Sequence, residues 1–320
     1  MLKTYTIPIT TKQITNLYDL WVNNGFENEK NIDINKNLLS GSEVKSNQIK
    51  LYVYEKAATV LSSAIIIINN NNPSISGVGE VCTSVNSRGK GLANTLCEKI
   101  VDDYFLNNQS RAIFLGTINP VAEKIYKSLG WQMIKNTNVM FNSKNQDDFE
   151  SFLLTYNKPN STKIITKGNS DFRISIIPFV LSQRSKNQID LNSKVNLINK
   201  LSSCLGLYNK YDSLYVKKGN WFSVSDNENR LFSIVSYLEK EDKKFRIDGL
   251  FNYLYYDEAK KLVEFVINKL VNQKPNKISV EIYKKDTSKL QMFHELGFIE
   301  KNNIQKKIDG KDLEFKEFIL

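Results

Sequence analysis

The sequence is poor in the residues that bind metals and form disulfides. It contains three cysteines (Cys82, Cys97 and Cys204), a single histidine (His294) and six prolines. No two cysteines form a C-x-x-C pair, and an odd number does not fit a disulfide framework. One histidine argues against most zinc sites and against a catalytic triad whose other members lie far away. We therefore expect a metal-free protein of a reducing compartment.

The chain also lacks a hydrophobic run that could cross a membrane. Its longest apolar stretch, residues 58–68, is about half of what a spanning helix needs. The N-terminus has no apolar core of the signal-peptide kind. These absences predict a cytoplasmic protein that does not enter the membrane.

The length and composition are those of two globular domains. The 320 residues are 41% hydrophobic and 24% charged, which is enough for a sizeable core in each half. Turn-forming residues cluster at Asn157, Pro159, Asn160 and Ser161. We expect a boundary near Lys158–Lys167, with domains at residues 1–158 and 165–320.

The net charge of +10 lies mainly in the second half. Residues 1–160 carry 16 basic and 14 acidic side chains, whereas residues 161–320 carry 28 and 20. The basic residues are spread along the second half rather than packed into one run, which is typical of a solvated surface. An anionic partner, such as nucleic acid or an acidic protein, is the alternative.

Apolar periodicity predicts an α/β layered first half around a mostly antiparallel sheet. The expected strands are residues 5–9, 49–54, 59–68, 79–83, 112–116 and a closing strand at 149–156. The expected helices are residues 12–23, 92–105 and 121–129.

The second half repeats this order about 160 residues later. The expected strands are 172–179, 220–225, 231–238, 245–250 and 278–283, and the expected helices are 189–201, 257–271 with Asp257 as N-cap, and 287–296. Two copies of one α/β (α+β) architecture explain the repeat, each a mixed sheet flanked by helices. Two unrelated α/β domains are the alternative.

A glycine-bearing loop joins a predicted strand to a long predicted helix. It reads Arg88-Gly89-Lys90-Gly91-Leu92-Ala93. Gly89 and Gly91 permit close backbone approach, so that successive N–H groups can face one anion. The helix N-terminus adds partial positive charge, and Arg88 and Lys90 add full charges. The loop favours a pyrophosphate, although it has neither the P-loop pattern nor the dinucleotide fingerprint.

A second motif follows after room for one helix and one strand. It places Asn119 at a strand end and Tyr126 on the next helix. Its pattern is N-x-x-A-x-x-x-Y-x-x-x-G-W, formed by Asn119, Ala122, Tyr126, Gly130 and Trp131.

With both motifs in this order, the first 150 residues resemble the GNAT N-acetyltransferase superfamily. The acetyl-CoA loop of that family has the pattern [RQ]-x-x-G-x-[GA], which Arg88, Gly91 and Ala93 match. The resemblance implies a transferase that moves an acetyl group from acetyl-CoA to an amine. The acceptor remains open: small amines, peptide N-termini and lysines all fit.

The resemblance also implies roles for individual residues. The backbone of Cys82, Thr83, Ser84 and Val85 would pair with the pantetheine arm, and one N–H there would stabilise the thioester oxyanion. The loop from Arg88 to Ala93, with Gly89, Lys90, Gly91 and Leu92 between them, would hold the pyrophosphate. Asn119 would contact the CoA arm. Tyr126 would protonate the departing thiolate; packing of its ring is the alternative.

The general base is less clearly marked, since the first half has no histidine. Glu80 precedes the loop and would accept the proton of the amine, directly or through water, if burial raises its pKa. A solvent-facing carboxylate and an amine captured already neutral are the alternatives. We interpret Cys82 and Cys97 as core residues rather than nucleophiles.

The second copy departs from these motifs. Phe293 stands where Tyr126 does and Asp286 where Asn119 does, and the loop before the long helix has no glycine but contains Asp257 and Glu258. We expect Tyr253, Tyr255 and Tyr256 to pack, and His294 to lie on a helix surface. The second domain is thus predicted to have lost the cofactor site. A non-catalytic acyl-CoA sensor or adaptor is the competing interpretation of the whole chain.

Overall fold

The computed structural model describes residues 1–25, 32–158, 163–183, 187–201 and 203–320. The chain divides into two compact units. Unit 1 is Met1–Tyr156 together with a short segment that ends at Leu205, and unit 2 is Asn157–Leu201 and Gly206–Leu320. Three of the residues that mark the predicted boundary, Pro159, Asn160 and Ser161, lie outside the described residues.

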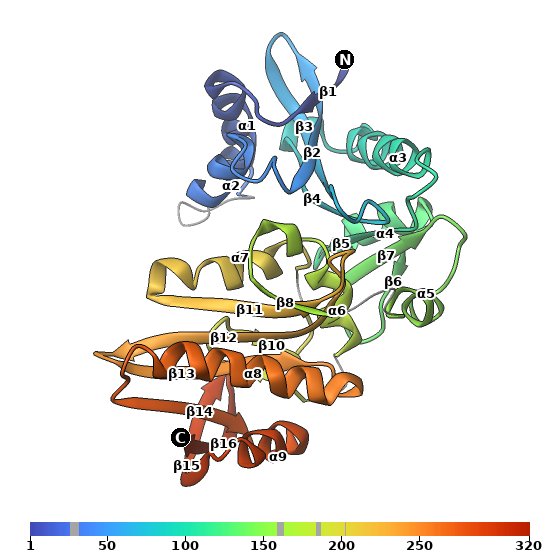
Figure 1. Ribbon diagram of the computed structural model, residues 1–320. Helices are drawn as coiled ribbons and strands as arrows, with labels where there is room; N and C mark the ends of the chain where they lie inside the picture. Colours follow the sequence, from blue (N-terminus) through green and yellow to red (C-terminus); the bar gives the residue numbers. More distant parts are fainter. Residues whose placement is uncertain (26–31, 159–162, 184–186, 202) are drawn as a thin grey trace. The chain divides into compact units, whose positions relative to one another are not determined.

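Unit 1 is built on a seven-stranded sheet with the order β1-β2-β3-β4-β5-β7-β6 (Figure 1). Neighbouring strands are antiparallel except β4 and β5, which are parallel. The strands are β1 (Leu2–Thr6), β2 (Asn47–Lys56), β3 (Thr59–Asn69), β4 (Ile75–Thr83), β5 (Ala112–Gly116), β6 (Gln132–Met133) and β7 (Val139–Ser143).

Helices cover both faces of this sheet, with α1 and α3 on opposite sides (Figure 1). The helices are α1 (Thr11–Asn23), α2 (Ile32–Leu39), α3 (Leu92–Phe105), α4 (Pro120–Ser128) and α5 (Phe149–Tyr156), and a 3-10 turn, η1 (Val85–Ser87), precedes α3. The apolar face of α3 contributes Leu96, Cys97 and Ile100 to a core shared with the sheet. Their spacing of three and four residues explains why this segment is an amphipathic helix.

Unit 2 has a seven-stranded sheet with the matching order β8-β11-β12-β13-β14-β16-β15. Its one parallel pair, β13 with β14, corresponds to β4 with β5. The strands are β8 (Ile164–Lys167), β11 (Gly219–Ser225), β12 (Leu231–Glu241), β13 (Lys244–Phe251), β14 (Lys277–Tyr283), β15 (Ile299–Ile308) and β16 (Lys311–Ile319). The predicted tandem pair of mixed, mostly antiparallel sheets flanked by helices is confirmed.

The remaining elements of unit 2 surround this sheet. The helices are α6 (Ile176–Ser182), α7 (Gly206–Asp212), α8 (Tyr256–Val271) and α9 (Thr287–Glu295), with 3-10 turns η2 (Ser170–Phe172), η3 (Tyr215–Lys217) and η4 (Tyr253–Tyr255). Two short strands, β9 (Ile189–Asp190) and β10 (Val195–Asn196), form a separate ladder. As expected, α8 and α9 occupy the positions of α3 and α4.

Four predictions of local structure were wrong. Residues 149–156 are helix α5, not a strand. Residues 172–179 contain the end of η2 and the start of α6 instead of a strand. Six of the seven side chains of α6 are buried, so its sequence is a continuous apolar run without the pattern of a helix that has one exposed face. Residues 189–201 contain β9 and β10 instead of a helix, with a turn at Lys194, where φ is +60°. The N-cap of α8 is Tyr255, so that Asp257 lies in the first turn.

The aromatic residues of α5 explain the first of these errors. Phe149, Phe152 and Tyr156 are buried, and their spacing places them on one side of a helix. The rings of Phe149 and Phe152 pack against Phe114 of β5 and Phe141 of β7, with centroids 5.3–6.2 Å apart. A short aromatic segment resembles a strand in composition, and only its period distinguishes the two.

Two substitutions on α5 test this assignment. Phe152 is 2% exposed and Leu154 is 73% exposed. In a strand, residues two apart share a face, whereas in a helix they lie on opposite sides. We expect Phe152→Ala to lower the free energy of unfolding by about 3–5 kcal/mol. Leu154→Ala should change it by less than about 0.5 kcal/mol. Urea unfolding measures both, and equal losses would contradict the helix.

Candidate active site

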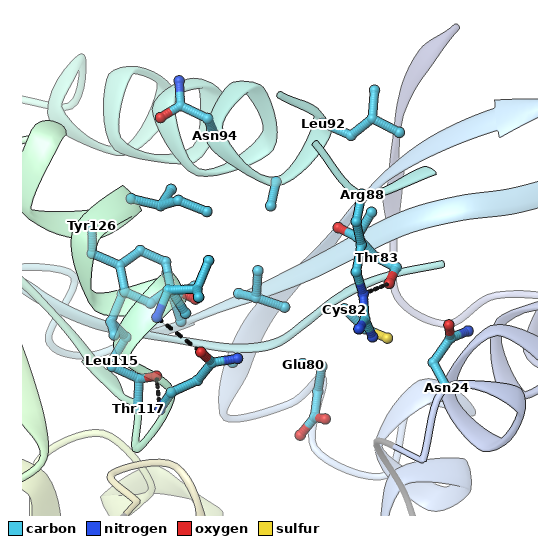
Figure 2. Close-up of a pocket in the computed structure, with 18 of the residues that line it drawn as sticks. Asn24, Glu80, Cys82, Thr83, Arg88, Leu92, Asn94, Leu115, Thr117 and Tyr126 are labelled. Atoms are coloured by element: carbon cyan, nitrogen blue, oxygen red, sulfur yellow. Dashed lines mark hydrogen bonds between the residues drawn. The ribbon is translucent and has the colours of Figure 1, made fainter. Parts of the chain in front are cut away.

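The two parallel strands of unit 1 separate partway along their length. Their ladder ends at Val78 opposite Leu115, whereas β4 continues to Thr83. A cavity of about 760 Å³ opens beyond this point, lined by β4, the turn before α3, α3 itself and the segment from β5 to α4 (Figure 2). Its volume is in the range of small-molecule sites.

A bulge in β4 lies at the wall of this cavity. The register with β3 shifts after Ser63, which stands opposite Cys82, and Glu80 has a φ of +53°. Ser63 fixes the bulge, because its Oγ donates to the backbone oxygen of Glu80 at 3.0 Å and accepts from Nε1 of Trp21 at 2.9 Å. Figure 2 shows Glu80 across the cavity from Leu92 and Asn94 of α3. Glu80 is half-buried.

The turn before α3 has the left-handed conformation that its glycines permit. Gly89 and Gly91 have φ values of +74° and +75°, and a Cβ on either would meet no atom within 4 Å. Gly91 is the N-cap of α3, and no side chain caps this helix. The first N–H groups of α3 are therefore available to an external acceptor.

Two cations flank this turn. Arg88 is exposed, and its Nε donates to the backbone oxygen of Thr83 at 3.2 Å. Nζ of Lys90 donates to the backbone oxygen of Asn86 at 2.9 Å. Arg88 lines the cavity, whereas Lys90 is not among its lining residues.

The helix α4 supplies the opposite wall. Asn119 caps it, since its Oδ1 accepts from the N–H of Val121 at 2.9 Å. Tyr126 lies on α4 among the lining residues, is 5% exposed, and packs its ring 6.1 Å from that of Trp131. Burial raises the pKa of Tyr126, and the nearby thiol of Cys97 adds to the effect, so the hydroxyl keeps its proton at neutral pH.

Most of the residues predicted for the site line this one cavity: Glu80, Cys82, Thr83, Arg88, Gly89, Gly91, Leu92, Ala93, Asn119 and Tyr126. Ser84, Val85 and Lys90 are not among the lining residues. Val85 is 57% exposed, and its N–H donates to Oδ1 of Asn24 at 2.8 Å. The sequence analysis missed Asn24 and Thr117, which also line the cavity. No motif marks either residue, because each reaches the cavity through the fold.

The cysteines of unit 1 are core residues, as predicted. Cys82 is 5% exposed and Cys97 is 2% exposed. Burial raises the pKa of Cys82 to about 11; Glu80 adds to the rise and Arg88 opposes it. Burial raises the pKa of Cys97 to about 12. Neither is a thiolate at neutral pH.

The corresponding positions of unit 2 are occupied as the sequence alignment of the two halves predicts. Asp286 caps α9 as Asn119 caps α4, and Phe293 follows Asp286 by the same seven residues. Phe293 is fully buried, and His294 is exposed on the helix. Tyr253, Tyr255 and Tyr256 pack against the core of unit 2.

Within the described ranges, no group of three or more His, Cys, Asp or Glu side chains is placed to hold a metal ion. The same part of the chain contains no helix that is long and apolar enough to cross a membrane.

No family model and no curated protein matches the sequence. Several solved structures are similar to half of it. A protein of Acinetobacter baylyi ADP1 assigned as an acetyltransferase is 14% identical over 50% of this chain and 94% of its own, with a TM-score of 0.40. The spermidine N-acetyltransferase of Vibrio cholerae is 14% identical over the same shares, with a TM-score of 0.38. A Desulfovibrio desulfuricans protein assigned to the GNAT family is 10% identical over 45% of this chain and 99% of its own, with a TM-score of 0.38.

These similar structures carry the names of acetyltransferases, the class that the two motifs predict. Because identity is low and the similarity covers about half of the chain, the choice of substrate and of catalytic residues rests on the geometry of the cavity.

The reactivity of the Cys82 thiol tests whether this wall of the cavity is shielded from water. With a pKa of about 11, about one molecule in a thousand carries the thiolate at pH 8. We expect alkylation of Cys82 by iodoacetamide to be about two orders of magnitude slower than that of a free thiol, and to accelerate up to about pH 11. The urea-unfolded chain is the control, with all three cysteines reactive. Rapid alkylation of Cys82 in the native chain at pH 8 would disprove the expected burial.

Proposed function

We propose that unit 1 transfers an acetyl group from acetyl-CoA to a primary amine. One observation carries the proposal: a single cavity brings together an uncapped helix N-terminus with two left-handed glycines, a strand edge freed from its ladder, and a protonated tyrosine. The turn before α3 suits the pyrophosphate of acetyl-CoA, and the part of the cavity near Tyr126 suits the thioester at the end of its pantetheine arm.

The turn before α3 fits the pyrophosphate. The N–H groups of Gly89, Gly91 and Leu92 lie at or just before the positive end of a fourteen-residue helix. The first turn of α3 contains no acidic residue that would compete for this end. Arg88 adds a full positive charge at the rim of the cavity, where it can pair with a phosphate.

The far end of the cavity fits the chemistry of transfer. The amine nitrogen attacks the thioester carbonyl, the C–S bond breaks, and the acetyl group ends as an amide. Tyr126 gives its proton to the departing CoA sulfur. Glu80, the one carboxylate among the described residues that line the cavity, accepts the proton that the amine loses. The N–H of Ser84 donates to the oxygen of Leu61 in β3, so strand alternation turns the backbone of Thr83 toward the cavity. The N–H of Thr83 would there stabilise the oxyanion that forms on attack.

Gly91→Glu tests the pyrophosphate assignment. It places a negative side chain at the positive end of α3, and repulsion from the phosphates should weaken acetyl-CoA binding at least about tenfold. Gly310→Glu is the matched control, since Gly310 also has a positive φ (+82°) and open space around its Cα. Titration calorimetry compares the two variants with the wild-type chain. Equal acetyl-CoA affinity in all three would refute the assignment.

Tyr126→Phe tests the general acid. It keeps the buried ring and removes the proton donor, so turnover should fall on the order of 10²–10⁴-fold while acetyl-CoA affinity stays nearly unchanged. Tyr104→Phe is the control: Tyr104 is also buried in unit 1, and its hydroxyl donates to backbone oxygens of Pro73 and Ala112 away from the cavity. Full activity in Tyr126→Phe would assign that tyrosine to packing.

The proposed activity is tested by the release of CoA thiol from acetyl-CoA. The panel of acceptors includes a polyamine such as spermidine, small monoamines, a peptide N-terminus and a lysine peptide. We expect release that depends on one of these amines, with an acetylated product of the mass expected for one acetyl group. Acetyl-CoA binding without transfer to any amine would instead support a binding or adaptor role.

A further inference from the structure

Unit 2 repeats the separation of parallel strands that creates the cavity in unit 1. The ladder between β13 and β14 ends at Arg246, whereas β13 continues to Phe251. Phe251 corresponds to Thr83, because each is the last residue of its strand. Each also stands opposite a serine of the next strand, Ser233 or Ser62.

The edge of β13 beyond the ladder exposes backbone groups toward this gap. The N–H of Asn252 donates to the oxygen of Phe232 at 3.1 Å, so Asn252 faces β12. Strand alternation then turns the backbone groups of Phe251 and Gly249 away from β12, toward β14. Buried groups of this kind need partners.

Gln188 provides two of these partners. Its Nε2 donates to the oxygen of Phe251 at 2.7 Å, and its Oε1 accepts from the N–H of Phe251 at 2.7 Å. Gln188 is fully buried. A side-chain amide thus makes the paired hydrogen bonds that a neighbouring strand, or an amide of a bound ligand, would make.

Lys289 of α9 provides the third. Its Nζ donates to the oxygens of Gly249 and Ile189 and to Oδ1 of Asp248, each at 2.8 Å. Lys289 is 1% exposed, and Asp248 is fully buried. All three protons of the ammonium are used, which is what a buried lysine requires.

The chain after Gln188 continues along β13. The N–H of Leu191 donates to Oδ2 of Asp248 at 2.7 Å, and Nη2 of Arg246 donates to the oxygen of Leu191 at 3.1 Å. Nδ2 of Asn192 donates to the oxygen of Arg246 at 3.0 Å. Residues 188–192, here called the inner segment, are therefore fixed to β13 from Arg246 to Phe251.

The end of the gap near α8 also lacks the features that suit an anion in unit 1. The loop from Asn252 to Ala259 has no glycine. Asp257 and Glu258 lie in the first turn of α8, and Glu258 pairs with Lys163 at 2.7 Å. Unit 2 thus places negative charge where unit 1 places Arg88 and two glycines.

We infer that the inner segment is a built-in occupant of the strand gap in unit 2. Gln188 and Lys289 satisfy the edge of β13 that would otherwise face an open cavity, so unit 2 binds no acyl-CoA. The equivalence of this gap with an acetyl-CoA site rests on the proposed function of unit 1. The contact between Gln188 and Phe251 is independent of that proposal.

Hydrogen exchange of the Phe251 amide in the full chain tests the contact. We expect strong protection in the wild type. Gln188→Leu keeps the size of the side chain and removes both bonds, so exchange at Phe251 should become at least about tenfold faster. Gln188→Glu keeps the acceptor for the Phe251 N–H but loses the donor, and should expose this amide less than Gln188→Leu does. Gln291→Leu, on the exposed face of α9, is the control and should change nothing at Phe251.

An unprotected Phe251 amide in the wild type would overturn the inference, even if the variants failed to fold. So would unchanged protection of that amide in a folded Gln188→Leu variant.

Titration of the wild-type chain with acetyl-CoA tests the second half of the inference. We expect one molecule per chain, with exchange protection gained at residues 88–93 and not at 252–259. Two molecules per chain, with protection at 252–259, would overturn it. No binding at all would refute the proposed function of unit 1, whereas the result at Phe251 would still decide whether Gln188 occupies the gap.

Discussion

The structure depends on one constraint: two parallel strands that part must find other partners for their backbone groups. The parallel ladder stops at Val78 in unit 1 and at Arg246 in unit 2. Beyond these residues, the backbone N–H and C=O groups on one edge of the strand need other hydrogen-bond partners. Unit 1 leaves that edge facing a cavity. Unit 2 covers it with Gln188 and Lys289. The same topology is thereby compatible with a binding site in one unit and a closed core in the other.

The helices that follow the two gaps meet a second constraint in opposite ways. The N-terminus of any long helix carries partial positive charge and unsatisfied N–H groups. In α8 this charge is met by Asp257 and Glu258, in its own first turn. In α3 the first turn has no acidic residue and no side-chain cap. The N-terminus of α3 therefore has room for an external anion, whereas that of α8 is already matched by its own carboxylates.

The features predicted from the sequence are those fixed by local spacing. The amphipathic pattern of α3 and α8 repeats every three to four residues, and each of the two motifs, residues 88–93 and 119–131, is a short continuous segment. The inner segment escaped prediction because Gln188 bonds to Phe251, 63 residues away. Ile189, with the apolar residues that follow it, resembles a helix until those contacts are known. The bulge at Glu80 was missed for the same reason, since its anchors, Ser63 and Trp21, come from other elements.

The two units also separate what a buried aromatic side chain does for the fold from what it does for chemistry. Tyr126 and Phe293 occupy the same position, and each packs against the aromatic residue after the helix-ending glycine, Trp131 or Phe298. Phe293 shows that this fold needs the ring and not the hydroxyl. A buried hydroxyl with no partner costs roughly 1–3 kcal/mol, but the hydroxyl of Tyr126 is not among the buried polar atoms without a partner in the described residues, and Tyr126 lines the cavity. Packing therefore does not require that hydroxyl, whereas the proposed transfer requires a proton donor at the cavity wall, which is where Tyr126 lies.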